Sequence, residues 1–175
     1  RKVDLLLFDE PLSNLDAKIR VQVRQELRNL QSNLGVTTLY VTHDQEEALA
    51  ISDFIAVIKN GEVVEWGHPK ELYQNPKYQF TADFLGTTNL IQGEVLLQKD
   101  SRGGKMGCSL GEVIFDANGW SMDDGEPFLV SIRPENIVIG RDVADDRENS
   151  FSGVIESAVF LGPFIDYVVR GGNMT

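Results

Sequence analysis

Four consecutive apolar residues, Leu5 to Phe8, run directly into Asp9, Glu10 and Pro11. An apolar run of this length, without polar alternation, is typical of a strand that is buried on both faces, as in a parallel sheet. Pro11 has no backbone N–H to continue such a strand. We therefore expect a strand over residues 4–8 that belongs to an α/β fold and carries two acids at its carboxyl end.

A regular alternation of helices and strands follows. The apolar stripe of a helix is formed by Ile19, Val23, Leu27, Leu30 and Leu34, and Gly35 stands where helices commonly end. Further strands are expected over residues 37–42, 54–58 and 62–66, with a hairpin turn at Asn60-Gly61, and short helices over 44–51, 70–74 and 78–84. This order predicts part of an α/β sandwich over residues 1–86.

The pattern changes near residue 87, where the helical stripes end. Short alternating segments separated by turn residues occupy the rest of the chain, and strands are expected over residues 90–97, 113–115, 128–132, 137–139, 151–160 and 164–169. The second half, residues 87–175, is therefore predicted to be an all-β module that forms a small barrel.

Composition excludes several classes of protein. The 175 residues carry 16 Lys and Arg against 27 Asp and Glu, a net charge of −11, which argues against binding to a nucleic-acid duplex. The single cysteine, Cys108, excludes an internal disulfide framework and a CxxC metal site. Unbroken apolar runs such as Leu5 to Phe8 fall far short of the roughly 20 residues that cross a bilayer.

The acids at the end of the first strand are candidate catalytic residues. Open α/β sheets bind ligands at the carboxyl ends of their strands. There Asp9 could hold Mg²⁺, which prefers oxygen ligands and keeps several waters, and Glu10 could orient or deprotonate an attacking water. An acidic turn after an ordinary strand is an equally simple interpretation of these two residues alone.

Two further positions have a structural and a functional interpretation. The segment from Ser13 to Asp16 is, by itself, typical of the N-cap of the helix that follows. His43 ends the strand over residues 37–42, and a lone histidine is usually a structural or surface residue. If the strands over residues 4–8 and 37–42 are parallel neighbours, however, their ends lie about 5 Å apart and His43 lies beside Glu10.

Together these segments resemble a known family. Residues 5–16, LLLFDEPLSNLD, look like the Walker B motif and D-loop of ABC transporter ATPases, and residues 40–48, YVTHDQEEA, look like their H-switch. Residues 61–73, GEVVEWGHPKELY, resemble the segment that follows in importer subunits. SIRPEN at 131–136 and FLG at 160–162 resemble the TOBE regulatory barrel of importers for sugars, polyamines, ferric iron or oxyanions. In this order and spacing the motifs are highly specific, and they cover nearly the whole chain.

The resemblance implies a fold and a role for each site residue. It implies a partial P-loop NTPase domain, of the ABC ATPase type, followed by an OB-like TOBE barrel. Asp9 would bind Mg²⁺ through water, Glu10 would be the general base, and His43 would contact the γ-phosphate of ATP and Glu10. Ser13 and Asp16 would couple the two nucleotide sites of a homodimer.

The phosphate-binding loop of the family is missing from these 175 residues. The motif G-x-x-x-x-G-K-[ST] does not occur, since the only Gly-Lys pair, Gly104-Lys105, is followed by Met106, and no LSGGQ signature is found. We therefore expect a piece of a longer protein whose β-barrel is incomplete at its C-terminus. The piece alone is expected to be inactive.

The resemblance also implies partners and a location. The parent would be the ATP-hydrolysing subunit of an ABC importer at the cytoplasmic face of the membrane. Permease subunits would be its direct partners and a solute-binding protein an indirect one. The alternative is a non-catalytic module that serves in dimerisation, in regulation or in binding a small oxyanion.

Overall fold

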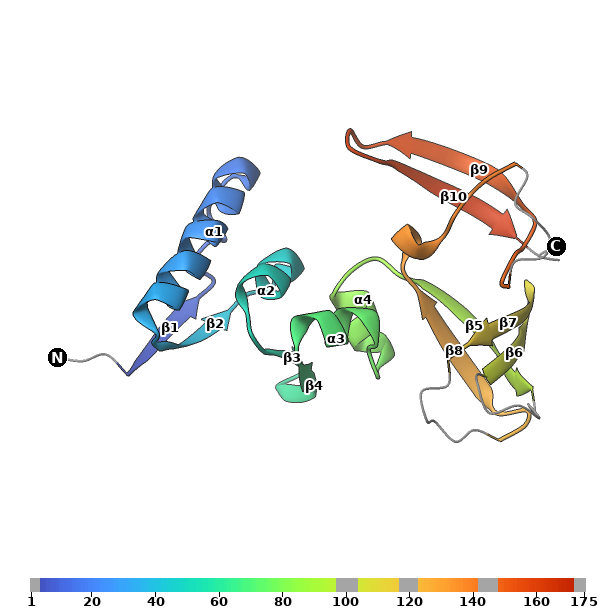
Figure 1. Cartoon of the computed structure of the whole chain (residues 1–175), viewed down its shortest axis with the longest axis horizontal. Coiled ribbons are helices and arrows are strands. Elements are labelled where there is room, and N and C mark those ends of the chain that lie inside the picture. Colours follow the sequence, from blue (N-terminus) through green and yellow to red (C-terminus); the bar gives the residue numbers. More distant parts are fainter. Residues whose placement is uncertain (1–3, 97–103, 117–122, 142–147, 172–175) are drawn as a thin grey trace. The chain divides into compact units, whose positions relative to one another are not determined.

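The computed structural model describes residues 4–96, 104–116, 123–141 and 148–171. The chain divides into two units between Thr88 and Asn89, the first blue to green and the second yellow-green to red in Figure 1. The first unit mixes helices and strands, and the second consists of strands apart from one short 3₁₀ turn. The predicted order of an α/β half followed by an all-β half is therefore confirmed. None of the described helices combines the length and the apolar character needed to cross a membrane.

The first unit begins with two parallel strands joined by a long helix. Its elements are β1 (Leu5–Asp9), α1 (Ala17–Leu34), β2 (Thr37–Val41), α2 (Gln45–Ile51), β3 (Ile55–Lys59), β4 (Glu62–Gly67), α3 (Pro69–Gln74) and α4 (Gln79–Phe84). β1 and β2 are hydrogen-bonded in parallel, with Leu5 opposite Thr37 and Asp9 opposite Val41. Both carboxyl ends therefore lie at the same edge of this two-stranded sheet.

Helix α1 begins and ends where its sequence predicts. One carboxylate oxygen of Asp16 accepts hydrogen bonds from the backbone N–H groups of Lys18 and Ile19, at 3.1 and 3.0 Å. At the other end Gly35, with φ of 59°, donates its N–H to the carbonyl of Gln31. Left-handed backbone of this kind suits glycine because it has no Cβ.

The apolar faces of this region are less buried than the sequence predicts. Leu5 and Leu7 of β1 are 56% and 64% exposed, and Leu39 of β2 is 55% exposed. Leu6 and Phe8, on the other face of β1, are half-buried, and the Phe8 ring lies 6.0 Å from that of Tyr40. The expected burial on both faces is therefore wrong for this chain taken alone, where one face of the sheet is covered only in part and the other is exposed.

A small core forms around the β3–β4 hairpin. Asn60 and Gly61, with φ of 53° and 82°, make the tight turn between the two antiparallel strands. The buried cluster consists of Ile55, Val57, Leu72 and Leu85, with Ala48, Leu49, Tyr73 and Phe80 packed against it. Helices α2, α3 and α4 thus bury their apolar residues against this hairpin.

The second unit consists of a four-stranded antiparallel sheet and a hairpin. Its elements are β5 (Asn89–Leu96), β6 (Gly104–Cys108), β7 (Gly111–Phe115), β8 (Pro127–Ile132), the 3₁₀ turn η1 (Pro134–Asn136), β9 (Gly153–Phe160) and β10 (Ile165–Gly171). The sheet has the order β7-β6-β5-β8, and β9 pairs with β10. The all-β prediction for this half is confirmed.

Two details of that prediction differ from the structure. Residues 104–108 form strand β6, although their glycines suggest a turn. A Cβ at Gly104 would overlap the Phe115 ring, so glycine permits the close pairing of β6 with β7. Residues 137–139 were expected to form a strand, but they follow η1 without strand pairing and are exposed. Residue 97, expected at the end of a strand, lies outside the described residues.

Candidate functional site

Glu10 adopts a strained backbone conformation directly after β1. Its φ is 44°, in the left-handed region that residues with a Cβ seldom occupy. Its N–H donates to the carbonyl of Val41 at 2.8 Å, which extends the β1–β2 ladder by one bond. Its carbonyl accepts from the N–H and the hydroxyl of Ser13, at 3.3 and 3.0 Å. Three hydrogen bonds therefore hold a conformation that is costly by itself, as is common at functional sites.

The side chains of Glu10 and His43 meet at the shared edge of β1 and β2. Nδ1 of His43 lies 3.0 Å from Oε1 of Glu10. The hydrogen bond to Glu10 and the negative charge of that carboxylate raise the pKa of His43 above its ordinary value. The side chain of His43 is 71% exposed and that of Glu10 is 45% exposed, so the pair is open to a ligand from solvent.

Asp9 lies beside this pair as the last residue of β1, opposite Val41 in the register. Its side chain is exposed. In the part of the chain that the structure describes, no three His, Cys, Asp or Glu side chains are grouped to hold a metal ion. A single exposed carboxylate fits Mg²⁺ held through water, because this ion keeps most of its waters and is commonly bound by one or two carboxylates together with phosphates.

Ser13 and Asp16 have local structural partners in this chain. Asp16 caps α1, as the structural interpretation predicts, and Ser13 bonds to the Glu10 carbonyl. Both residues are exposed, whereas Leu12 between Glu10 and Ser13 is only 2% exposed. The segment is therefore anchored by one buried leucine and presents its polar residues to solvent.

Glu47 is a buried acid whose hydrogen bonds differ from those that the sequence predicts. Its spacing from Asp44 predicts a capping box, in which Glu47 would bond back to the Asp44 N–H. Asp44 does cap α2, but its own N–H donates to the hydroxyl of Thr42. Glu47, 2% exposed, instead accepts from the hydroxyls of Tyr40 and Thr42, at 3.0 and 2.9 Å. It thereby ties α2 to the end of β2.

Burial and hydrogen bonding shift two pKa values in this network. Burial, together with the hydrogen bond to Glu47, raises the pKa of Tyr40 well above its ordinary range. Burial would also raise the pKa of Asp44, but hydrogen bonds from the Glu47 N–H, from Arg20 and from the Glu46 N–H outweigh it and lower that pKa. Asp44, next to His43, is therefore ionised and firmly bonded.

Arg20 is a second residue that the sequence analysis missed. Its guanidinium donates to the carbonyl of Leu15 at 3.0 Å and to a carboxylate oxygen of Asp44 at 2.9 Å. A weak signal was present, because Arg20 stands one turn after Asp16, off the apolar stripe of α1. The partner 24 residues away follows only from the packing of α1 against α2.

Comparisons with known proteins match this chain to import proteins. Residues 130–175 match the TOBE domain family. An Fe(3+) ions import ATP-binding protein, FbpC, of Fusobacterium nucleatum is 47% identical over 161 residues, which are 92% of this chain and 41% of the relative. FbpC 1 of Rhizobium meliloti is 42% identical over 166 residues, 95% of this chain and 45% of the relative. A spermidine/putrescine import ATP-binding protein, PotA, of a Nostoc species is 40% identical over 167 residues, 95% of this chain and 44% of the relative.

The chain is related to the ATP-binding subunits of ABC importers. This confirms the resemblance of its motifs, including the TOBE segment. The chain spans less than half the length of the curated relatives it matches.

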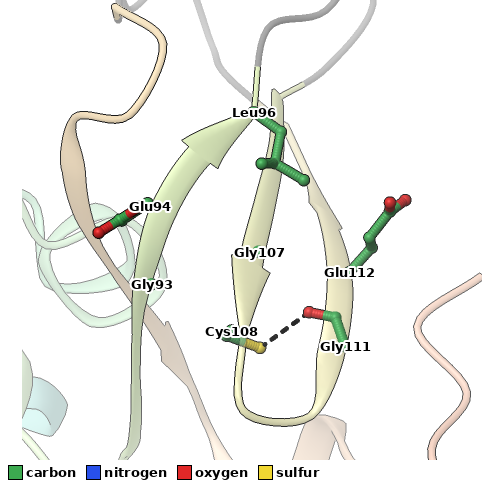
Figure 2. Close-up of a pocket in the computed structure, with 7 residues that line it drawn as sticks. All are labelled: Gly93, Glu94, Leu96, Gly107, Cys108, Gly111 and Glu112. Atoms are coloured by element: carbon green, nitrogen blue, oxygen red, sulfur yellow. Dashed lines mark hydrogen bonds between the residues drawn. The ribbon is translucent and has the colours of Figure 1, made fainter.

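The second unit, which contains the TOBE match, has an open hollow over β5, β6 and β7 (Figure 2). Glycines line much of it, and the acids Glu94 and Glu112 lie at opposite sides. The thiol of Cys108 donates to the carbonyl of Gly111 at 3.3 Å, across the β6–β7 turn. The cysteine is thus part of the hairpin, and the hollow gathers no set of groups comparable with Glu10 and His43.

Proposed function

We propose that this chain is part of an ATP-binding subunit that hydrolyses ATP to drive solute uptake by an ABC importer. The observation that carries the proposal is the 3.0 Å contact between His43 and Glu10 at the carboxyl ends of two parallel strands. A base and a histidine at the ligand-binding edge of an α/β sheet match the chemistry of phosphoryl transfer to water. The homology to import ATP-binding proteins supports the same function.

Each residue has a distinct task in this proposal. Glu10 orients the attacking water and accepts its proton, and the three hydrogen bonds to its backbone fix the main chain from which its side chain projects. His43 contacts the terminal phosphate of ATP and is held toward the reaction by Glu10. Asp9 binds Mg²⁺ through water; when bound, this ion neutralises charge on the phosphates.

ATP binding requires groups that these 175 residues do not contain. Backbone N–H groups of a glycine-rich loop normally cradle the phosphates, and that motif does not occur in the sequence. We therefore expect residues 1–175 alone to bind Mg-ATP weakly and to show no measurable hydrolysis. Micromolar affinity by calorimetry would contradict this expectation.

The remaining assignments concern domains and partners. Residues 1–86 would be the ATPase part and residues 87–175 the TOBE regulatory part. The exposed Ser13 and Asp16, on a segment anchored by Leu12, would contact the second ATPase subunit of a homodimer. The subunit would lie at the cytoplasmic face of the membrane, bound to permease subunits and served indirectly by a solute-binding protein.

The names of the relatives give two different cargoes, Fe(3+) ions and spermidine/putrescine, although the relatives are similarly identical to this chain. Similar identity to relatives named for different cargoes argues against cargo selection by this chain. We propose that selection of the solute is left to the binding protein and the permeases.

The decisive experiment uses a longer protein that contains this sequence and has the full length of the relatives, called here the subunit of the relatives' length. Glu10→Gln keeps the size of the side chain and removes the base, so ATP turnover should fall by about 10³-fold or more while nucleotide binding persists. An exposed acid outside the site, Glu26→Gln, is the matched control. A parent without ATPase activity would favour the alternative, a non-catalytic regulatory or oxyanion-binding module.

A further inference from the structure

Arg20 joins two segments that the proposed mechanism treats as separate parts. Its Nη2 atom donates to the carbonyl of Leu15, the residue directly before the Asp16 cap. Its Nη1 atom donates to Oδ2 of Asp44, the residue directly after His43. One planar guanidinium thus bonds the segment over residues 13–16 to the turn over residues 42–44.

The surroundings make this bridge stiff. The side chains of Arg20 and Asp44 are 29% and 21% exposed, so both charged bonds are partly shielded from water. The Nε atom of Arg20 lies 3.9 Å from the buried carboxylate of Glu47, which in turn accepts from Tyr40 and Thr42. Thr42 also accepts from the Asp44 N–H. The turn that carries His43 is therefore bonded on both sides, to β2 and to α1.

The other arginines of α1 pair with acids further along the chain than Asp44. Arg24 pairs with Glu46, whose side chain is 72% exposed. Arg28 donates to the carbonyl of Ile51 and to Asp53, at the opposite end of α2. Arg20 and Arg28 thus make comparable two-point links from α1, one beside His43 and one far from it.

We propose that Arg20 is a positioning residue that links the exposed segment over residues 13–16 to His43, so that displacing one segment moves the other. The proposal rests on the proposed function, because Arg20 would transmit a subunit contact at Ser13 or Asp16 to the His43–Glu10 pair. The geometry requires the forked guanidinium, since its two N–H groups point to separate acceptors. A lysine ammonium at position 20 keeps the charge but has no rigid fork.

The first test is independent of ATP. In the nucleotide-free subunit of the relatives' length, the ring nitrogens of His43 are observed by ¹H–¹⁵N NMR in the unaltered protein, in Arg20→Lys and in Arg28→Lys. Arg20→Lys should shift the Nδ1 resonance toward that of Glu10→Gln, which lacks the carboxylate, and Arg28→Lys should leave it in place. An unchanged resonance in Arg20→Lys, or an equal shift in Arg28→Lys, would overturn the proposal.

The second test separates positioning from folding. Arg20→Lys should lower kcat about tenfold while the Kd for ATP changes less than about threefold, and Arg28→Lys should alter neither. Full activity in Arg20→Lys would contradict the proposal that the forked guanidinium of Arg20 is required. If the unaltered subunit hydrolyses no ATP, the proposed function fails, and the NMR comparison still decides whether Arg20 positions His43.

Discussion

Nδ1 of His43 lies 3.0 Å from Oε1 of Glu10, although 33 positions separate the two residues in the sequence. The parallel pairing of β1 with β2 creates this proximity, because it brings the residues after Asp9 and after Val41 to one edge. Neither side chain is buried, so the contact depends on how firmly the two turns are held. Ser13 holds the turn at Glu10, and Asp44 with its partners holds the turn at His43.

Replacement of His43 tests its role in hydrolysis. In the subunit of the relatives' length, His43→Ala should reduce kcat by at least about 10²-fold, a loss of about 2.7 kcal/mol of transition-state stabilisation. ATP binding should change little, because the proposed phosphate cradle lies elsewhere. Steady-state kinetics together with ATP titration measure both effects. If kcat stays within about threefold, His43 is a structural residue.

The pH dependence of the His43–Glu10 contact follows from the raised pKa of His43. A group whose pKa is raised by folding stabilises the folded state fully below its unfolded pKa, about 6.5 for histidine, and this contribution is lost as the pH rises through the raised value. An NMR titration of the His43 ring should therefore show a midpoint above the ordinary value. Glu10→Gln should lower that midpoint, because it removes both the carboxylate acceptor and its charge. An identical midpoint in the two proteins would mean that the contact does not form in solution.

Several local features could be predicted from the sequence because neighbouring residues determine them. Asp16 and Asp44 cap the helices that follow, Gly35 ends α1, and Asn60 with Gly61 turns the β3–β4 hairpin. The meeting of His43 with Glu10 was predicted only on the condition that their strands are parallel neighbours. That condition is met.

The remaining features depend on packing that local patterns do not contain. Arg20 finds Asp44 only because α1 lies against α2, and Glu47 turns inward because the hydroxyls of Tyr40 and Thr42 face it. Strand β6 was missed because glycine normally weakens a strand, whereas here it allows close contact with β7. In all three cases a tertiary contact outweighs the preference of the residue itself.

Removal of the buried Glu47 carboxylate should destabilise the first unit. Glu47→Ala leaves the hydroxyls of Tyr40 and Thr42 without this acceptor in a largely buried place, and we expect the free energy of unfolding to fall by about 2–3 kcal/mol. The adjacent Glu46→Ala is the control, since that side chain is 72% exposed, and it should cost less than about 1 kcal/mol. Urea unfolding followed by circular dichroism measures both. Equal losses for the two variants would show that the Glu47 network contributes no special stability.

A methyl group at position 93 tests the close approach of β5 to β6. The Cβ of Gly93→Ala would overlap the carbonyl oxygen of Gly107 and lie 2.6 Å from Cγ of Met106, a residue that is fully buried. Because a backbone carbonyl cannot move aside without breaking the strand pairing, we expect a loss of about 1–3 kcal/mol in the free energy of unfolding.

Gly107→Ala is the matched control for that variant on the neighbouring strand. Its Cβ would meet side-chain atoms of Leu96 at 3.5 Å, an ordinary contact, and alanine loses less backbone entropy than glycine on folding. The unfolding free energy of Gly107→Ala should therefore stay within about 0.5 kcal/mol of the unaltered protein. Thermal and urea unfolding of both variants give the comparison. A Gly93→Ala protein as stable as Gly107→Ala would mean that β5 and β6 are not paired in the register that places Gly93 opposite Cys108.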